Sequence, residues 1–158
     1  MLRLVLIQVG IPLSVVNWIL ACVTSTNYVV LVNGTPTSFF KAGRGLQQGC
    51  PLSPLLFLLL IEGLSRMIIS AKDVGTLHGI NISRALAITH LLFLDDIILF
   101  RNCSMEEWRV LHNIFNTFCC ATGMMINFDK SLILSHKVNQ GTLLQILDMF
   151  PAQEGEFE

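Results

Sequence analysis

The stretch HLLFLDDIILF, residues 90–100, places two adjacent aspartates between two blocks of apolar, strand-forming residues. Burying a pair of carboxylates without a counter-charge is costly. We therefore expect a tight β-hairpin whose strands are the apolar blocks and whose turn carries Asp95 and Asp96. At a turn, both acids can reach solvent or a hard divalent cation such as Mg²⁺, which prefers carboxylate oxygens together with substrate phosphates. An Asp-Asp pair is equally typical of an ordinary solvated turn, so the assignment needs a second signal.

The composition favours a folded domain, or part of one. The 158 residues are 53% hydrophobic and 13% charged, which excludes a disordered chain and is more apolar than most soluble domains. This composition fits a small membrane-associated protein or a piece of a larger body. Since no uninterrupted apolar run reaches the roughly 20 residues that span a bilayer, we expect no membrane association. Apolar patches should instead be exposed around residues 2–7 and 143–150.

Charge and cysteine content narrow the function classes. The net charge of −1 gives no basic surface that would bind nucleic acid unaided. The five cysteines are odd in number and none shows a CxxC spacing, which argues against a disulfide scaffold or a zinc site. A reducing intracellular setting, nuclear or cytoplasmic, is therefore expected.

The remaining pattern predicts alternating helices and strands. Asn33-Gly34 is a strong hairpin signal, Ser53 is a good helix N-cap with Pro54 at the first helical position, and Gly123 should end a helix. Glu106 and Glu107 suit the first turn of the helix that Gly123 should end. The expected class is α+β, an antiparallel sheet with helices on one face. The predicted helices are 12–26, 55–70, 104–122 and 142–149, and the predicted strands are 28–32, 37–40, 131–135 and the two arms of the 90–100 hairpin.

The second signal is RGLQQGCPLSPLLF, residues 44–57. Together with the hairpin it resembles the reverse transcriptases of non-LTR (LINE-type) retrotransposons, in which RGLxQGxPLSPxLF precedes HLLFADDxLLF by a few dozen residues. Further similar segments are VNG at 32–34, GMMINFDKS at 123–131, and VGIP at 9–12 followed by Trp18-Ile19. Several ordered motifs over nearly the whole chain make the resemblance specific.

The resemblance implies the palm of an RNA-directed DNA polymerase, a nucleotidyltransferase that uses two Mg²⁺ ions. It implies that Asp95 ligates metal directly, that Asp96 supports it, and that Lys130 acts near the leaving pyrophosphate. The alternative for Lys130 is a solvated loop lysine, and the glycine-rich loop could be a plain connection before a helix. The partners implied are an RNA template and a DNA primer, and the implied substrate-binding residues are Gly45, Gln48, Gly49, Pro51 and Ser53.

The resemblance also marks what these residues lack. The family uses a third carboxylate from an earlier strand, which is not found here, and Leu94 replaces its usual Ala. We therefore expect residues 1–158 to be a partial reverse transcriptase domain, without the first catalytic strand, fingers and thumb of a longer parent chain. Such a fragment should be inactive alone. The alternatives are a non-catalytic remnant that serves as an interaction module and a small membrane-associated protein.

Overall fold

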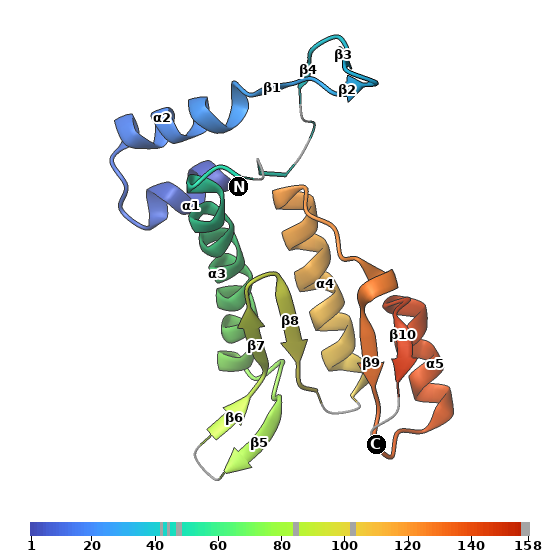
Figure 1. Cartoon of the computed structure of the whole chain (residues 1–158). Coiled ribbons are helices and arrows are strands. Elements are labelled where there is room, and N and C mark those ends of the chain that lie inside the picture. Colours follow the sequence, from blue (N-terminus) through green and yellow to red (C-terminus); the bar gives the residue numbers. More distant parts are fainter. Residues whose placement is uncertain (42, 44, 47–48, 84–85, 102–103, 156–158) are drawn as a thin grey trace. The chain divides into compact units, whose positions relative to one another are not determined.

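The computed structural model describes residues 1–41, 43, 45–46, 49–83, 86–101 and 104–155. The chain divides into two compact units (Figure 1). The first comprises Met1–Ile61 and Thr122–Met124, and the second comprises Glu62–Ala121 and Met125–Glu158. The dividing point falls within one long helix, so each unit takes part of it.

The first unit is a small helical core with an attached hairpin. It contains α1 (Leu2–Gln8), α2 (Leu13–Thr24) and the first part of α3 (Leu52–Asp73). Leu6, Val16 and Leu56, one from each helix, form its buried core. The hairpin consists of β1 (Asn27–Tyr28), β2 (Leu31–Val32), β3 (Thr35–Pro36) and β4 (Phe40–Lys41).

The predicted Asn33-Gly34 turn is confirmed. Both residues have positive φ, +51° and +81°, as a type I′ hairpin turn requires. The inner pair β2–β3 and the outer pair β1–β4 are separated by a short gap that Thr37 bridges. Its amide donates to the Val30 carbonyl at 2.9 Å, and its hydroxyl accepts from the Val30 amide at 3.1 Å.

The second unit holds the remainder of α3 and two consecutive hairpins. These are β5 (Ile80–Ser83) with β6 (Leu86–Ile88), and β7 (His90–Phe93) with β8 (Asp96–Leu99). They are followed by α4 (Met105–Thr122), the 3₁₀ turn η1 (Phe128–Lys130), β9 (Leu132–Leu134), α5 (Gln140–Met149) and β10 (Gln153–Gly155). The hydrophobic core of this unit gathers Leu64, Ile68, Leu77, Leu111, Ile114, Phe115, Phe118, Leu143, Ile146 and Phe150.

Aromatic contacts join α4 to the end of α5. The Phe150 ring lies edge-on to Trp108 and Phe115, with ring centroids 5.6 and 6.2 Å apart. These geometries are the ones that aromatic quadrupoles favour. The predicted helices over 12–26, 104–122 and 142–149 are confirmed in place, and Gly123 ends α4 with φ +74°.

The strands do not form the single antiparallel sheet expected from the sequence. Among the described residues, the strands pair two by two; β9 and β10 are parallel and the other pairs are antiparallel. Each strand is two to four residues long, so most of them pair only with their hairpin neighbour. The mixture of helices and small antiparallel sheets is compatible with the α+β class.

The start of α3 also differs from the prediction. The helix begins at Leu52, so Ser53 and Pro54 lie inside its first turn and Ser53 is not the N-cap. Proline is tolerated there because the first amides of a helix have no intrahelical acceptor. The Cys50 sulfur faces the backbone amides of Leu52 and Ser53, and these amides lower the pKa of the Cys50 thiol.

Helix α3 is long and apolar enough to cross a membrane, judged by length and composition, and is the one such helix in the part of the chain that the structure describes. The core helices of soluble proteins pass the same test. Leu56, Leu64 and Ile68 are almost wholly buried within the structure, whereas Leu55, Leu58 and Ile69 are 45–60% exposed.

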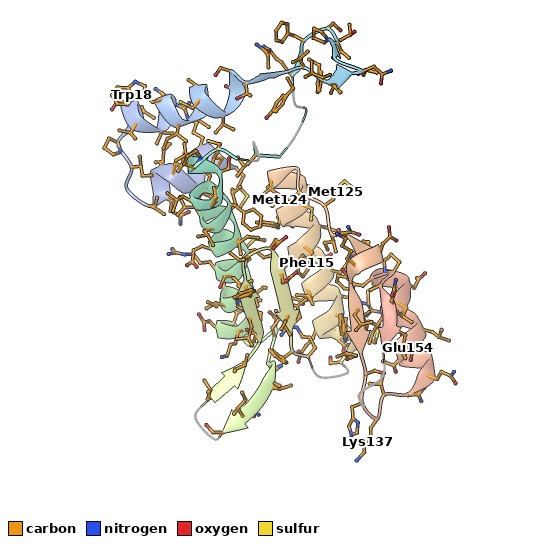
Figure 2. All side chains as sticks on the ribbon, viewed as in Figure 1. Trp18, Phe115, Met124, Met125, Lys137 and Glu154 are labelled. Atoms are coloured by element: carbon orange, nitrogen blue, oxygen red, sulfur yellow. The ribbon has the colours of Figure 1, made fainter. Side chains whose placement is uncertain are left out.

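Large exposed apolar side chains lie mostly elsewhere than expected. Around residues 2–7, Leu4 is 70% exposed as predicted. In 143–150, Leu144 is 64% exposed as predicted, whereas the amphipathic α5 buries Leu143, Ile146 and Phe150. The first unit instead exposes Phe39 and the strand segment 29–32. Figure 2 shows Trp18, 68% exposed, projecting from α2.

Candidate active site

The two aspartates lie at the tip of the hairpin formed by β7 and β8. Figure 1 shows the ribbon of this hairpin. Phe93 pairs with Asp96 and His90 with Leu99, which leaves a two-residue turn made of Leu94 and Asp95. The predicted hairpin is thus confirmed, with the refinement that Asp96 is the first residue of β8. Both carboxylates are exposed, as expected for charged groups that have no buried counter-charge.

The two faces of the hairpin differ. Residues directly opposite each other in an antiparallel pair share a face, and the faces alternate along each strand. Asp96 therefore lies on the same face as Phe93, Leu91 and Ile98, and these three apolar residues are between 48% and 72% exposed. The opposite face carries His90 and other half-buried residues. The acidic tip thus adjoins an exposed apolar strand surface.

The turn itself is strained. Leu94 has φ +53°, a left-handed conformation that glycine adopts freely and that costs other L-residues about 1–2 kcal/mol. A positive φ at the first central residue is the arrangement that places Gly in two-residue type II′ turns. The Leu94 side chain is 65% exposed, so little burial offsets this cost.

The hairpin suits a hard divalent cation in chemistry. Aspartate oxygens are the ligands that Mg²⁺ prefers, and Mg²⁺ is commonly held by one or two carboxylates plus water and substrate phosphates. The described residues form no group of three or more His, Cys, Asp or Glu side chains able to hold a metal ion. Asp95 and Asp96 are the two carboxylates at this tip.

Lys130 ends η1 in the same unit as the aspartates and is exposed. No hydrogen bond or ion pair between described residues joins it to either of them. The η1 turn is held by local bonds, among them the Ser131 hydroxyl to the Asn127 carbonyl at 2.8 Å. Both interpretations of Lys130, a catalytic residue or a solvated loop residue, stay open.

The glycine-rich loop belongs to the first unit. Gly45 and Gly49 are exposed and have φ +87° and +81°, values that explain glycine at both positions. Pro51 is exposed and Ser53 is half-buried at the start of α3. Gln48, another of the predicted substrate-binding residues, lies outside the described residues.

The base of the hairpin carries a polar layer, formed by Thr89, Phe100 and Arg101, that the sequence did not predict. Thr89 is 5% exposed and lies between β6 and β7. The Thr89 carbonyl accepts from the Phe100 amide at 2.9 Å and from Arg101 Nη1 at 3.3 Å, and Arg101 Nη1 also donates to the Phe100 carbonyl at 2.8 Å. Burial lowers the pKa of Arg101, and the charge of Glu107 opposes that shift.

Glu107 brings a carboxylate into the interior next to this layer. It is 5% exposed, and its Oε1 lies 2.9 Å from Nδ1 of His78, while its Oε2 and the Nε and Nη2 atoms of Arg101 are buried without a hydrogen-bond partner. The first-turn position of Glu107 was predicted from the sequence; its burial was not. Buried polar atoms without a hydrogen-bond partner are uncommon in folded proteins, and each of them lowers the stability of this layer.

Comparison with known proteins identifies the family. Residues 6–144 match the model of the family described as reverse transcriptase (RNA-dependent DNA polymerase). The match spans the glycine-rich loop, the aspartate hairpin and η1. The chain belongs to the reverse transcriptase family.

The chain is similar in sequence to polyproteins of retrotransposable elements. It is 32% identical over 105 residues to the Pol polyprotein of the type-2 retrotransposable element R2DM of Drosophila melanogaster, covering 66% of this chain and 9% of that protein. It is 26% identical over 129 residues to the type-1 element R2 Pol polyprotein of Popillia japonica, covering 80% of this chain and 20% of that protein. The resemblance to non-LTR reverse transcriptases is thereby confirmed.

A third relative is an uncharacterized mitochondrial protein of Arabidopsis thaliana, 46% identical over 67 residues. That match covers 42% of this chain and 55% of the relative. The chain therefore spans about half of the mitochondrial relative and a fifth or less of the element polyproteins. The reverse transcriptase family uses divalent metal ions and binds nucleic-acid templates.

Proposed function

We propose that this chain is the palm region of a LINE-type reverse transcriptase, and that Asp95 and Asp96 hold its Mg²⁺. The observation that carries the proposal is the two-residue hairpin, which exposes both carboxylates at its tip within the segment that matches the family. Bound there, Mg²⁺ would neutralise the charge of the phosphates during nucleotidyl transfer onto a DNA primer along an RNA template. The oxygens of Asp95 and Asp96 would anchor the ion.

The roles of the other predicted residues are proposed from the family resemblance, which the backbone supports at the two glycines. Gly45 and Gly49 let the chain approach a ligand closely, because neither carries a Cβ and both have positive φ. Gln48, Pro51 and Ser53 are proposed to contact the incoming nucleotide from the same segment. Lys130 is proposed to place a positive charge near the leaving pyrophosphate.

Divalent-ion binding tests the proposal directly. Free Mn²⁺ is measured by electron paramagnetic resonance during titration of the chain, with Mg²⁺ as competitor. We expect Asp95→Asn to weaken Mn²⁺ binding about ten-fold, which corresponds to about 1.4 kcal/mol, and Asp95→Asn with Asp96→Asn to abolish binding at this site. Asp148→Asn, in the exposed part of α5, is the matched control and should bind like the unaltered chain.

Equal Mn²⁺ binding by the double variant and the unaltered chain would remove the hairpin as the metal site. The alternative of a non-catalytic interaction module would then be favoured. A primer-extension assay on an RNA template adds a second arm. We expect no extension by these 158 residues alone, since the family uses three carboxylates and the hairpin brings two. Extension that Asp95→Ala abolishes would instead show that this segment is a catalyst by itself.

A further inference from the structure

His90 connects the aspartate hairpin to a helix. Its Nε2 lies 2.8 Å from the hydroxyl oxygen of Ser65 on α3, and its Nδ1 lies 2.9 Å from the hydroxyl oxygen of Thr89. Ser65 and Thr89 are 8% and 5% exposed, so both bonds form away from bulk solvent. Both nitrogens of the ring are thus engaged, one on each side.

The bonds made by His90 continue into both ends of the hairpin. Thr89 precedes β7, and its carbonyl accepts from the amide of Phe100, the residue after β8. Arg101 Nη1 donates to the carbonyls of Thr89 and Phe100 and so closes the base from the other side. Hydrogen bonds therefore link α3 to the imidazole and the imidazole to the Thr89 hydroxyl, and the Thr89 carbonyl accepts from the residue that follows β8.

We propose that His90 is a positioning residue, which fixes the base of the β7–β8 hairpin to α3 and thereby holds Asp95 and Asp96 in place. The metal-binding role of Asp95 and Asp96 rests on the function proposed above, whereas the attachment of the hairpin to α3 does not. His90 touches no substrate in this scheme. It acts through the backbone of β7, five positions before Asp95.

Leverage explains why the base matters to the tip. Four strand residues at about 3.3 Å each put the tip about 13 Å from the base, so a tilt of about 10° displaces the aspartates by about 2 Å. A misplacement of about 1 Å can cost about a hundred-fold in the rate of a catalysed reaction. A two-stranded ribbon is only marginally stable by itself, so an attachment to a helix is needed to restrict such a tilt.

The charge state of the imidazole adds a test. Burial lowers the pKa of His90, the positive charges of Arg101 and Lys72 act in the same direction, and the negative charge of Glu62 opposes them. Neutral His90 has one donor and one acceptor nitrogen, and the two hydroxyls can satisfy either tautomer. Because its pKa is below 6.5 in the folded chain, His90 contributes stability above that pH, and the contribution is lost as the pH falls through the folded pKa.

Hydrogen–deuterium exchange of the full chain measures the attachment. We expect His90→Ala to speed exchange of the β7–β8 amides about ten-fold, the scale set by the loss of one buried hydrogen bond, while β9 and β10 amides stay unchanged. His90→Gln, which retains a donor and an acceptor, should restore part of the protection. His136→Ala, an exposed histidine of the same unit, is the matched control.

Two further comparisons sharpen the test. Ser65→Ala combined with His90→Ala should exchange no faster than His90→Ala alone, because both remove the same bond. As the pH falls through the folded pKa of His90, and after correction for intrinsic exchange, the unaltered chain should lose β7–β8 protection that His90→Gln keeps. Two results besides unchanged β7–β8 exchange would overturn the proposal: uniform acceleration across the second unit in His90→Ala, or strictly additive effects of the two alanines.

The two proposals fail separately. Equal Mn²⁺ binding by the unaltered chain and by the variant with both Asp95→Asn and Asp96→Asn contradicts the metal site and leaves the exchange result of His90→Ala unaffected. Unchanged β7–β8 exchange in His90→Ala contradicts the attachment, whatever the metal does. If both hold, His90→Ala should also weaken Mn²⁺ binding, while His136→Ala should not.

Discussion

Replacing Gly79 by alanine should lower the free energy of unfolding of the second unit more than a comparable glycine substitution elsewhere in that unit. Gly79 precedes β5 with φ +71°, and its Cα faces the backbone where β6 ends. A Cβ built there would lie 2.8 Å from the carbonyl carbon of Ile88, closer still to the oxygen of that carbonyl, and 3.0 Å from Cα of Thr89. These atoms are backbone and cannot rotate away.

The cost has two parts. A left-handed φ costs alanine about 1–2 kcal/mol, and the smaller entropy of the unfolded alanine chain returns part of this, which leaves about 1 kcal/mol. Forcing backbone apart to admit the methyl group adds about 2 kcal/mol, within the usual cost of overpacking. We therefore expect Gly79→Ala to lower the free energy of unfolding by about 3 kcal/mol.

Gly75→Ala is the matched control. Gly75 has nearly the same φ, +75°, and a Cβ there would meet nothing within 4 Å. It should cost only the conformational part, about 1 kcal/mol. The difference of about 2 kcal/mol corresponds to about 1 M in the urea midpoint, taking a slope of about 2 kcal/mol per M.

Tryptophan fluorescence in urea measures the difference. The chain has two tryptophans, and Trp108 packs against Phe150 within the second unit. Trp18→Phe in every variant removes the exposed tryptophan of the first unit, so the signal reports on Trp108. Equal urea midpoints for Gly79→Ala and Gly75→Ala would refute the steric argument. They would also contradict the close approach of Gly79 to the backbone of Ile88 and Thr89.

Two further predictions concern local backbone. Leu94→Gly should raise the free energy of unfolding by about 0.5 kcal/mol, because glycine adopts φ +53° freely and the lost side chain is mostly exposed; Leu94→Ala, which keeps the strain, should show no gain in the same urea titration. Asn139→Ala should cost about 1 kcal/mol, because the Asn139 side-chain oxygen accepts from the Gly141 amide at 2.8 Å and caps α5. Gln140→Ala beside it should be within about 0.5 kcal/mol of neutral, and a similar loss in both would contradict the cap.

Features with a local physical cause could be predicted from the sequence. Asn33-Gly34 fixes its turn because both residues accept positive φ, and Gly123 ends α4 for the same reason. The hairpin at 90–100 was predictable because two apolar blocks need burial while two carboxylates between them need solvent. The family motifs then indicated a metal-binding role for the residues at the tip, which the hairpin geometry alone does not indicate.

Other features depend on the register of distant segments and have no local signal. The hairpin of β5 and β6 and the strand β10 were not predicted; β10 pairs in parallel with β9 across α5, and a Cβ on Gly155 would meet the Leu134 side chain at 2.8 Å. The start of α3 was placed too late because Ser53 and Pro54 form a good capping signal at the wrong turn. The Cys50 sulfur, not the Ser53 side chain, faces the first amides.

The residues that support the hairpin illustrate the limit most clearly. A carboxylate pair at a turn is visible in eleven consecutive letters, because its cause lies within those letters. The attachment at its base needs Ser65, which is 25 positions from His90 and looks like any helical serine until the fold joins them. A histidine at a strand start is then read as a simple end residue. Only the folded chain shows that its two nitrogens connect α3 to the strand that leads to Asp95, so variants at Ser65 and His90 examine a contact that no motif marks.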